Sequence, residues 1–285
     1  MAVVGLIAVS HAVIFIRWAG DAPALLIAAM RVAIGTAVFL PFAFRGISPV
    51  ASNVGRARVL SLVSGLFLAL HFGAWIESVQ RLTIAESAVL VSLSPVWLVV
   101  FDVVTGKGWP DRRTLTGVVL CLAGTVLLGL DGLTRPSGDP VGLALAVIGG
   151  IAMAGYLAIG RQVRPVLPTA QYVSICYGTA ALALAAVGAA TGIVITGLPM
   201  DAWLAMLALG LVSQVLGHTS YNFALIRLSP VFASICLLGE PIFGTVLGLV
   251  YLGEAVPAAT LVGGVPILVG IWLSLQAEVR RSPRE

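Results

Sequence analysis

HTSYNFALIRLSP (residues 218–230) repeats, in outline, the stretch HFGAWIESVQRLT (residues 71–83). Each begins with a histidine, and Arg-Leu follows nine or ten residues later. His71 and His218 lie 147 positions apart, and Arg81 and Arg227 lie 146 apart. The same spacing of 146 or 147 continues downstream in the pairs Pro95 and Pro241, Pro110 and Pro257, Gly117 and Gly263, and Gly124 and Gly270. The sequence therefore contains an internal repeat.

The composition is that of an integral membrane protein. Of the 285 residues, 59% are hydrophobic and 10% are charged, and the mean hydropathy is +1.07. Soluble domains have about a quarter of their residues charged, and no water-soluble core encloses this much apolar surface. We attribute the net charge of +4 to loops at the inner leaflet rather than to nucleic-acid binding.

Ten apolar runs, separated by charged residues or by proline and glycine, are candidates for membrane-spanning helices. They are residues 2–17, 24–44, 59–79, 85–104, 113–131, 141–160, 168–192, 202–226, 230–252 and 257–277. The repeat spacing covers five of these runs, and because five is odd, the second copy crosses the membrane in the opposite sense. The prediction is an all-α membrane protein with two inverted five-helix repeats, residues 1–135 and 136–285, around a central cavity.

The basic residues between the runs predict the orientation. With alternate loops on opposite sides, one side carries Arg45, Arg56, Arg58, Lys107, Arg112, Arg113, Arg161, Arg164, Arg227, Arg280, Arg281 and Arg284. The other side carries only Arg17, Arg81 and Arg135. Because basic loops stay inside, both termini are expected in the cytoplasm. The first run has no basic residue before Arg17, so we expect a retained helix rather than a cleaved signal peptide.

Motifs of other functional classes are missing from the sequence. HExxH, GxSxG, Walker A and paired aspartates within the runs are all absent. Cys121, Cys176 and Cys236 lack the spacing of a zinc site or a disulfide framework. We therefore expect no enzyme, no metal and no cofactor. A channel remains an alternative, although the sequence has no filter-like repeat or ring of charges.

The order of several segments resembles the drug/metabolite transporter superfamily, specifically its EamA-like ten-helix exporters. The segments are APALLIAAMRVAIGTAVFLPFAF (22–44), GLALAVIGGIAMAGYLAIGRQVR (142–164), LSPVFASICLLGEPIFGTVLGLVYLGEAVP (228–257) and LVGGVPILVGIWL (261–273). They resemble helix 2, helix 6, helix 9 and helix 10 of that family. Within it, the chain is most similar to YddG-type exporters of aromatic and other neutral amino acids.

The resemblance implies a secondary transporter that exports small metabolites, such as threonine, methionine or aromatic amino acids, by alternating access. It also implies a cavity lined by helices 1, 3 and 4 and by their counterparts 6, 8 and 9. The alternatives are an exporter of other drugs or metabolites in the same superfamily and a channel-like facilitator.

Polar and aromatic side chains inside the runs are the candidates for lining this cavity, because polar groups within a membrane face protein or water. His71 and Trp75 share one helix face, and so do Gln214, His218 and either Tyr221 or Asn222. The other candidates are His11, Ser94, Trp97 and Tyr156. The alternative role for the histidines is packing through a hydrogen bond between helices. For the tryptophans it is ordinary packing or anchoring at the membrane interface.

Arg31 and Glu240 are the deepest charges, and Pro95 and Pro241 lie in mid-span at related positions of the two repeats. We expect Arg31 and Glu240 either to take part in transport coupling or to hold the structure together. The prolines are candidates for hinges or gates, with simple bending for packing as the alternative. The expected partners are a small-molecule substrate and the lipid bilayer, with no nucleic acid, and we expect a monomer.

Overall fold

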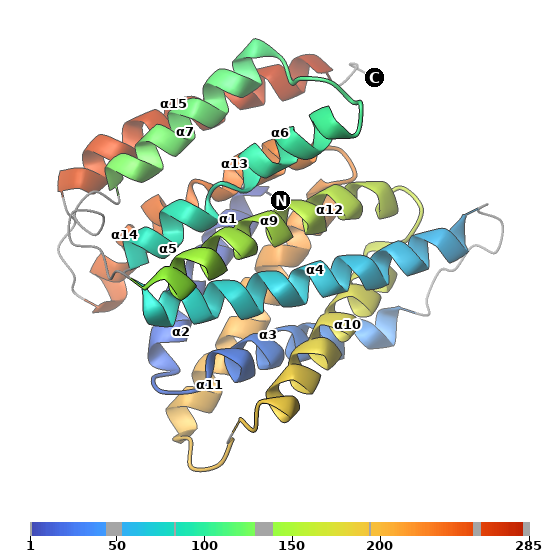
Figure 1. Cartoon of the computed structure of the whole chain (residues 1–285), viewed down its shortest axis with the longest axis vertical. Coiled ribbons are helices and arrows are strands. Elements are labelled where there is room, and N and C mark those ends of the chain that lie inside the picture. Colours follow the sequence, from blue (N-terminus) through green and yellow to red (C-terminus); the bar gives the residue numbers. More distant parts are fainter. Residues whose placement is uncertain are drawn as a thin grey trace.

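The computed structural model describes residues 2–43, 53–82, 84–128, 139–193, 195–252 and 258–281, and this part of the chain is helical throughout with short connections (Figure 1). In the first half the helices are α1 (Ala2–Ser10), α2 (Ala12–Trp18), α3 (Ala24–Phe39), η1 (Leu40–Phe42), α4 (Val54–Arg81), α5 (Ile84–Val91), α6 (Ser94–Val104) and α7 (Arg112–Leu128). In the second half they are α9 (Pro140–Val163), α10 (Thr169–Ala190), α11 (Met200–Ala208), η2 (Leu209–His218), α12 (Thr219–Ala224), α13 (Pro230–Leu237), α14 (Glu240–Leu252) and α15 (Ala258–Arg281).

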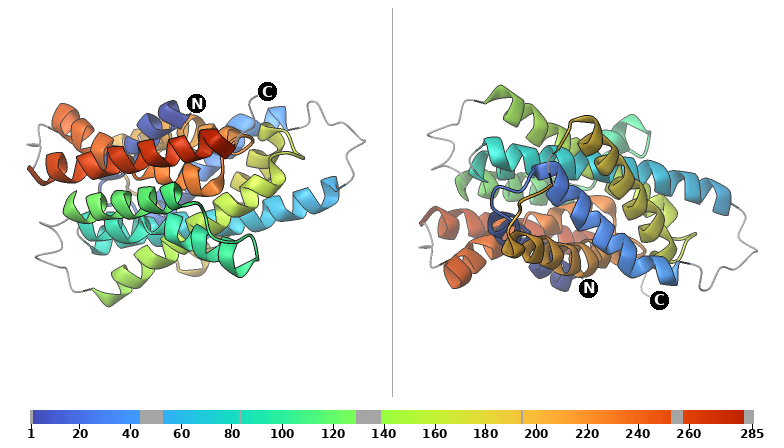
Figure 2. Two further views of the ribbon diagram at one scale, coloured as in Figure 1. Left: turned by 90° about the horizontal axis from the view of Figure 1, so that it is seen from above. Right: turned by 90° about the horizontal axis from the view of Figure 1, so that it is seen from below.

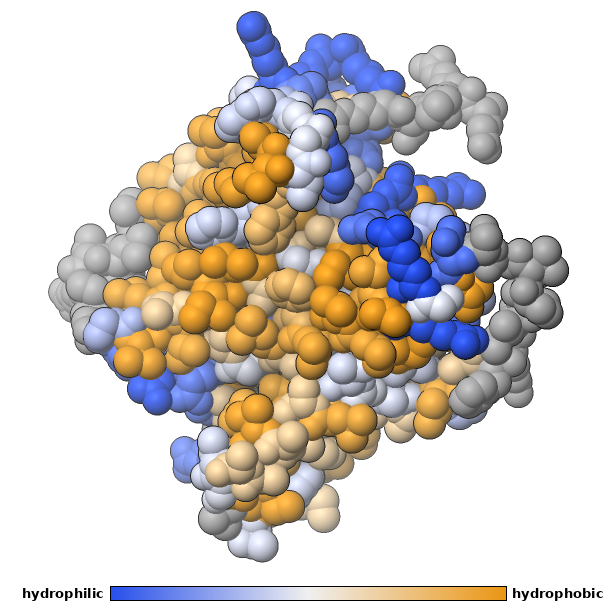
Figure 3. All heavy atoms as spheres, turned by 45° about the vertical axis from the view of Figure 1, so that its right-hand side comes forward, coloured by the Kyte–Doolittle hydropathy of each residue, from blue (hydrophilic) through white to orange (hydrophobic). Residues whose placement is uncertain are grey.

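Six helical stretches in the described residues are long and apolar enough to cross a membrane. They are Ala24–Phe42, Val54–Arg81, Pro140–Val163, Thr169–Ala190, Met200–Ala224 and Val262–Arg280. Large apolar side chains cover much of the outside, including Leu182, Val250 and Val119, which are 75%, 68% and 64% exposed. Figure 3 shows this apolar surface as a broad area, with hydrophilic residues gathered toward its margins. The chain is a multi-pass membrane protein whose outer surface suits lipid.

Three of the ten predicted runs are each broken into two separate α-helices. The run at 85–104 is divided between α5 and α6, and the run at 230–252 between α13 and α14. In both, the second helix has proline as its second residue, Pro95 in α6 and Pro241 in α14. Proline lacks the N–H that a continuous helix needs and its ring clashes with the preceding turn, so the helix is interrupted just before it.

The run at 2–17 is divided between α1 and α2 by a different cause. The Ser10 hydroxyl donates to the Leu6 carbonyl oxygen at 2.7 Å, and Nδ1 of His11 lies 2.8 Å from the Ile7 carbonyl oxygen. Side chains that bond to carbonyls four residues back compete with the backbone and bend a helix. The run at 113–131 corresponds to α7, which has 17 residues, and residues 129–131 lie outside the described part.

Helices α7 and α15 lie side by side at one edge of the molecule (Figures 1 and 2). A Cβ added to Gly117 would lie 2.7 Å from the Gly270 carbonyl oxygen, and one added to Gly270 would lie 2.6 Å from the Gly117 carbonyl oxygen. Two turns further on, a Cβ on Gly124 would lie 2.5 Å from the Gly263 carbonyl oxygen. Glycine is required here because the two backbones touch.

Helix α9 packs along α4 through its small residues. A Cβ on Gly155 would lie 2.6 Å from the Phe67 ring, and a Cβ on Gly142 would lie 2.8 Å from the Leu82 side chain. The backbone of Gly149 lies beside Trp75, where an added Cβ would be 3.5 Å from the tryptophan Cβ. This close approach places the aromatic side chains of α4 directly against the α9 backbone.

Candidate substrate site

Arg31 lies at the centre of a buried polar cluster that joins α3, α4 and η2. Its side chain is 1% exposed. Nε donates to Oε1 of Gln214 at 2.8 Å, and the guanidinium carbon lies 4.0 Å from the centre of the Phe72 ring. Arginine favours such a position over an aromatic face because the ring carries negative charge on its face. Among the described residues, Arg31 has no ion pair with an acidic group.

The segment η2 is a π-helix, and it carries both Gln214 and His218. Helices with this wider turn are rare and often occur at functional sites. Its turn of about 4.4 residues brings positions four apart closer to alignment than an α-helix does. Gln214 is fully buried and His218 is 5% exposed, so the π-helix presents both side chains to the interior.

His71 is held by the backbone of α9 and stacks on Trp75. Its Nδ1 lies 2.9 Å from the carbonyl oxygen of Gly149, and its ring is nearly parallel to that of Trp75, with centroids 6.0 Å apart and an interplanar angle of 3°. The imidazole centroid of His218 lies 6.5 Å from that of His71 and 5.1 Å from the Phe72 ring. The two histidines from the repeated sequence stretches thus lie in one aromatic cluster.

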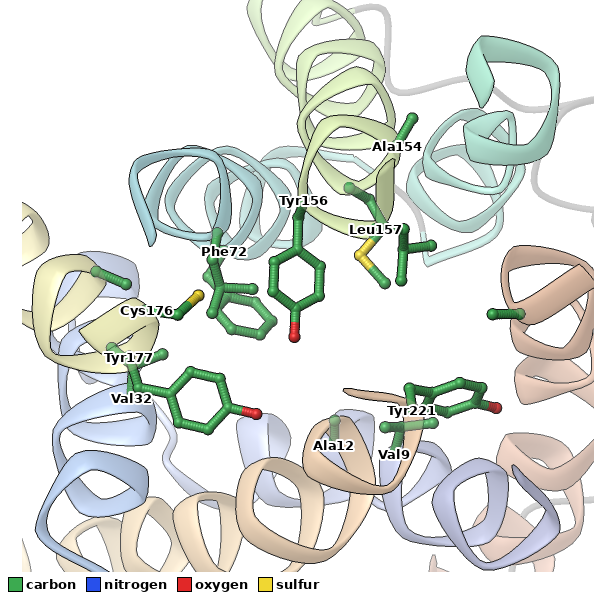
Figure 4. Close-up of a cluster of buried hydrophobic side chains, with 14 of the residues drawn as sticks. Val9, Ala12, Val32, Phe72, Ala154, Tyr156, Leu157, Cys176, Tyr177 and Tyr221 are labelled. Atoms are coloured by element: carbon green, nitrogen blue, oxygen red, sulfur yellow. The ribbon is translucent and has the colours of Figure 1, made fainter. Parts of the chain in front are cut away.

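A chain of hydrogen bonds borders this cluster on the side of α9 and α10. The Tyr156 hydroxyl donates to Oδ1 of Asn222 at 2.8 Å, and Nδ2 of Asn222 donates to the Tyr177 hydroxyl at 3.0 Å. The Tyr177 hydroxyl lies 3.1 Å from the Thr219 hydroxyl. Figure 4 shows the Tyr156 and Tyr177 hydroxyls pointing toward the same central region, whereas the Tyr221 hydroxyl points away from them.

Several buried polar atoms in the protein interior have no hydrogen-bond partner within the described residues. Those on the predicted site residues are Nη1 of Arg31, Nε2 of Gln214, Nδ1 of His218, the Tyr221 hydroxyl and Nε1 of Trp97. Buried polar groups in native proteins are nearly always paired. Unused donors in the interior of a membrane protein therefore indicate a place where a polar ligand or water is bound.

Three of the predicted site residues lie apart from this cluster. His11 is partly exposed and contacts Phe15 and Tyr251, with ring centroids 5.9 Å and 5.8 Å apart. Ser94 is buried, and its hydroxyl lies 2.8 Å from the Ser234 hydroxyl, which ties α6 to α13. Trp97 lies one turn after Ser94 in α6 and packs against the hydrophobic core.

Glu240 opens α14 and is partly buried, and no hydrogen bond links its carboxylate to another described residue. Pro95 is buried at the second position of α6, and Pro241 holds the same position in α14. In the described part of the chain, no three His, Cys, Asp or Glu side chains lie close enough together to share a metal ion.

Phe72, Tyr177 and Thr219 belong to the cluster but were not among the predicted site residues. Phe72 directly follows His71 and Thr219 directly follows His218, so their position next to a predicted site histidine could have pointed to both. The sequence indicates Tyr177 less clearly, because it lies in an apolar run that contains none of the residue pairs of the internal repeat. Its position opposite Asn222 comes from the packing of α10 against α12.

A separate groove of about 710 Å³ lies between α3, α4 and α10. Its walls are mainly apolar, with Leu66, Leu70, Leu184 and Val187, and Glu77 and Gln80 lie among the residues that line it. Leu66 and Leu70 are about half exposed, so the groove opens on the outside of the helix bundle. It contains none of the predicted site residues and is separate from the polar cluster.

Comparison with known proteins shows the family of this chain. The sequence pattern of the EamA-like transporter family matches residues 1–130 and again residues 140–276. The chain belongs to the EamA-like transporter family. It is 24% identical over 261 residues to an uncharacterized transporter of Archaeoglobus fulgidus, covering 92% of this chain and 90% of that protein. It is 23% identical over 248 residues to an uncharacterized transporter of Clostridium kluyveri, covering 83% of this chain and 78% of that protein.

The fold of this EamA-family protein is also found in a solved crystal structure. That structure superimposes with a TM-score of 0.78 at 21% sequence identity, covering 99% of this chain and 97% of the other. Nearly the whole chain therefore adopts a fold that is already known from a solved structure. The superfamily expected from the sequence is confirmed, and its members are transporters rather than enzymes.

Proposed function

We propose that this EamA-family protein is a secondary transporter that exports small metabolites by alternating access, with aromatic or other neutral amino acids such as threonine and methionine as substrates. The observation that carries the proposal is the buried cluster around Arg31, His71 and His218. The cluster combines unused hydrogen-bond donors with stacked aromatic rings, and it lies in the interior of the bundle that the helices form. Such a site suits a solute that has a polar end and an apolar or aromatic side chain.

The architecture that we propose for this transporter is ten spans in two inverted repeats, residues 1–135 and 136–285. The glycine contacts between α7 and α15 support it. In the sequence repeat, Gly117 corresponds to Gly263 and Gly124 corresponds to Gly270. In the structure, Gly117 contacts Gly270 and Gly124 contacts Gly263, so each contact is the repeat-related copy of the other. Reciprocal contacts of this kind are what a two-fold relation between the halves produces. The double match to the family pattern and the helix breaks before Pro95 and Pro241 support it too.

The breaks before Pro95 and Pro241 are the proposed hinges. Each joins two helical segments through backbone that no continuous helix restrains, and discontinuous helices in corresponding positions are common near the binding sites of secondary transporters. Ser94, directly before Pro95, is bonded to Ser234 of the other broken helix. The two proposed hinges are therefore linked, and a movement of one is transmitted to the other.

The proposed location is a bacterial-type inner membrane, with both termini in the cytoplasm. The distribution of basic residues supports this orientation. One of the basic residues assigned to the inner side also stabilises a helix end. Nη1 of Arg161 donates to the carbonyl oxygens of Leu225 and Ile226 at 2.7 Å and 2.6 Å, just past the end of α12.

Two alternatives remain within the membrane-protein class. An exporter of other metabolites would share the fold and differ in the residues around the cluster. A channel-like facilitator would need a continuous polar path, whereas the described cluster contains the fully buried aromatic rings of Phe72 and Tyr156. Saturable flux that is stimulated by substrate on the opposite side distinguishes a carrier from a channel.

The test is flux of radiolabelled threonine, methionine and tryptophan into proteoliposomes that contain the purified protein, with and without a pH gradient. The expected result is saturable uptake of at least one of the three. No uptake of any of them under either condition contradicts the amino-acid proposal. Conductance far above carrier rates contradicts the transporter mechanism. Empty liposomes and a heat-inactivated sample are the controls.

A further inference from the structure

Three buried nitrogen atoms that lack a partner belong to one small region. Nη1 of Arg31, Nε2 of Gln214 and Nδ1 of His218 are buried without a hydrogen-bond partner in the part of the chain that the structure describes. Leaving buried polar groups unpaired is costly, and it is most costly for a charged group. The region therefore offers hydrogen-bonding groups that a bound polar ligand can satisfy.

The hydrogen bond between Arg31 and Gln214 determines which way the glutamine amide faces. Nε of arginine can only donate, so Gln214 must turn its oxygen toward Arg31 and its Nε2 away from it. Arg31 and His218 both lie against the Phe72 ring, at 4.0 Å and 5.1 Å from its centroid. Two of the three unused nitrogen atoms thus come from side chains on one aromatic ring, and the third comes from Gln214, which is bonded to one of them.

The chemistry of these atoms is that of an anion site. The guanidinium and the amide NH₂ can only donate, and the imidazole nitrogen donates in one of its tautomers. A group of donors that carries one positive charge fits a planar anion with two oxygen atoms, which arginine binds in preference to other ligands. The ion pairs of the described residues involve Arg81 and Lys107. Glu240 is near enough to interact electrostatically with Arg31, but it forms neither an ion pair nor a hydrogen bond with it, so the donors of Arg31 are not used by a carboxylate of the chain.

We propose that Arg31, Gln214 and His218 bind the carboxylate of the transported solute. This inference rests on the proposed function and narrows its substrate class to carboxylates with an apolar or aromatic body. The stacked pair of His71 and Trp75 continues the aromatic surface beyond His218 and receives that body. An amine without a carboxylate lacks the group that satisfies the unused donors.

The experiment measures how much ligands raise the thermal unfolding temperature of the purified protein in detergent, a readout that does not require transport. The ligands are tryptophan, indole-3-propionate, which lacks the ammonium group, and tryptamine, which lacks the carboxylate. The expected result is saturable stabilisation by both carboxylates, with tryptamine weaker by about 10-fold or more. Equal stabilisation by tryptamine and indole-3-propionate overturns the proposal, and so does the lack of any stabilisation by the two carboxylates.

Two variants test the assignment to these residues. Arg31→Gln removes the charge and is expected to abolish the preference for carboxylates. Gln214→Glu places a carboxylate of the chain beside Arg31, so it keeps the buried charge paired and is expected to prevent stabilisation by external carboxylates. The second variant keeps the test valid if the first does not fold. A preference for carboxylates that survives in Gln214→Glu overturns the proposal.

The matched control is Arg164→Gln. Arg164 is also buried, but its three nitrogen atoms are all used by the chain, on the carbonyl oxygens of Asn222 and Leu167 and on the Thr169 hydroxyl. This variant is expected to retain the preference for carboxylates, and loss of that preference overturns the assignment to Arg31. Stabilisation by carboxylates without flux contradicts the proposed transport of amino acids, whereas flux without that preference contradicts only the carboxylate site.

Discussion

The Tyr156 hydroxyl donates to Oδ1 of Asn222 at 2.8 Å and so joins α9 to α12 in the interior of the protein. Both side chains are fully buried. The bond places the tyrosine ring beside His218, with centroids 6.3 Å apart. A helix–helix hydrogen bond thus holds the tyrosine that lies against the histidine singled out by the sequence repeat.

Replacing Asn222 with leucine is expected to destabilise the protein by about 1–2 kcal/mol. The change removes the acceptor of the Tyr156 hydroxyl, whereas the Tyr177 hydroxyl keeps Thr219 as a partner. The measurement is the free energy of unfolding for Asn222→Leu, Tyr156→Phe and the double variant. If the two single effects add up fully in the double variant, the bond does not contribute to stability.

Replacing Gly117 with alanine is expected to destabilise the protein by about 1–3 kcal/mol, because it overfills the contact between α7 and α15. The added Cβ would lie 2.0 Å from the Ser274 hydroxyl and 2.7 Å from the Gly270 carbonyl oxygen. Gly55→Ala in α4 is the control, because nothing lies within 4 Å of its added Cβ. Thermal unfolding should separate the two variants, and equal stability would contradict the close backbone contact.

The charge of Asp139 is expected to stabilise the protein near neutral pH and to lose this effect in acid. The pKa of Asp139 lies below its ordinary value of 3.8, first because the Gly142 backbone N–H donates to it and then because Val141 N–H and Arg81 do. A carboxyl group whose pKa is lower in the folded state stabilises above its unfolded pKa. That contribution is lost as the pH falls through the lower, folded pKa.

The measurement for Asp139 compares the thermal unfolding of the wild type and Asp139→Asn from about pH 7 down to about pH 3. Asparagine keeps the cap at the start of α9 but not the charge. The wild type should be the more stable at neutral pH, and the difference should shrink below about pH 4. A difference that stays constant over the whole range would show that the charge of Asp139 does not matter.

His218→Ala and Trp75→Ala are each expected to lower the flux of the best substrate by about 10-fold or more, with little loss of folded protein. Both residues belong to the aromatic surface around Phe72 and His71. His11→Ala is the control, because His11 contacts Phe15 and Tyr251 instead. If the yield of folded His218→Ala collapses, or if His11→Ala lowers flux as much, the packing role of the histidines is the better explanation.

Much of the helical fold follows from the sequence, because lipid-exposed helices need long apolar runs. The helices α4, α9 and α10 match the predicted runs to within a few residues. The break at His11 was not predicted, since hydropathy is the same on both sides of it. Pro95 and Pro241 were predicted as hinges or bends, but the sequence alone did not say that the helix is interrupted there. The choice between a bend and an interruption depends on whether neighbouring helices satisfy the freed backbone groups.

The candidate site was predictable only in part. The repeat singles out His71 and His218, and helical periodicity adds Trp75 and Gln214, which the structure brings together. The contact of Arg31 with Gln214 spans 183 positions, and no local pattern announces a pairing between helices so distant in sequence. The π-helix of η2 is equally invisible in the sequence, because it results from packing rather than from a distinct composition.

The most direct test of the transporter function is counterflow of tryptophan in proteoliposomes loaded with unlabelled tryptophan. An alternating-access carrier returns to the outer side faster with substrate bound, so labelled tryptophan should enter faster and saturably when unlabelled substrate is inside. Arg31→Gln should reduce this stimulated uptake by about 10-fold or more. Uptake that is linear with concentration and indifferent to substrate on the opposite side would contradict the carrier mechanism.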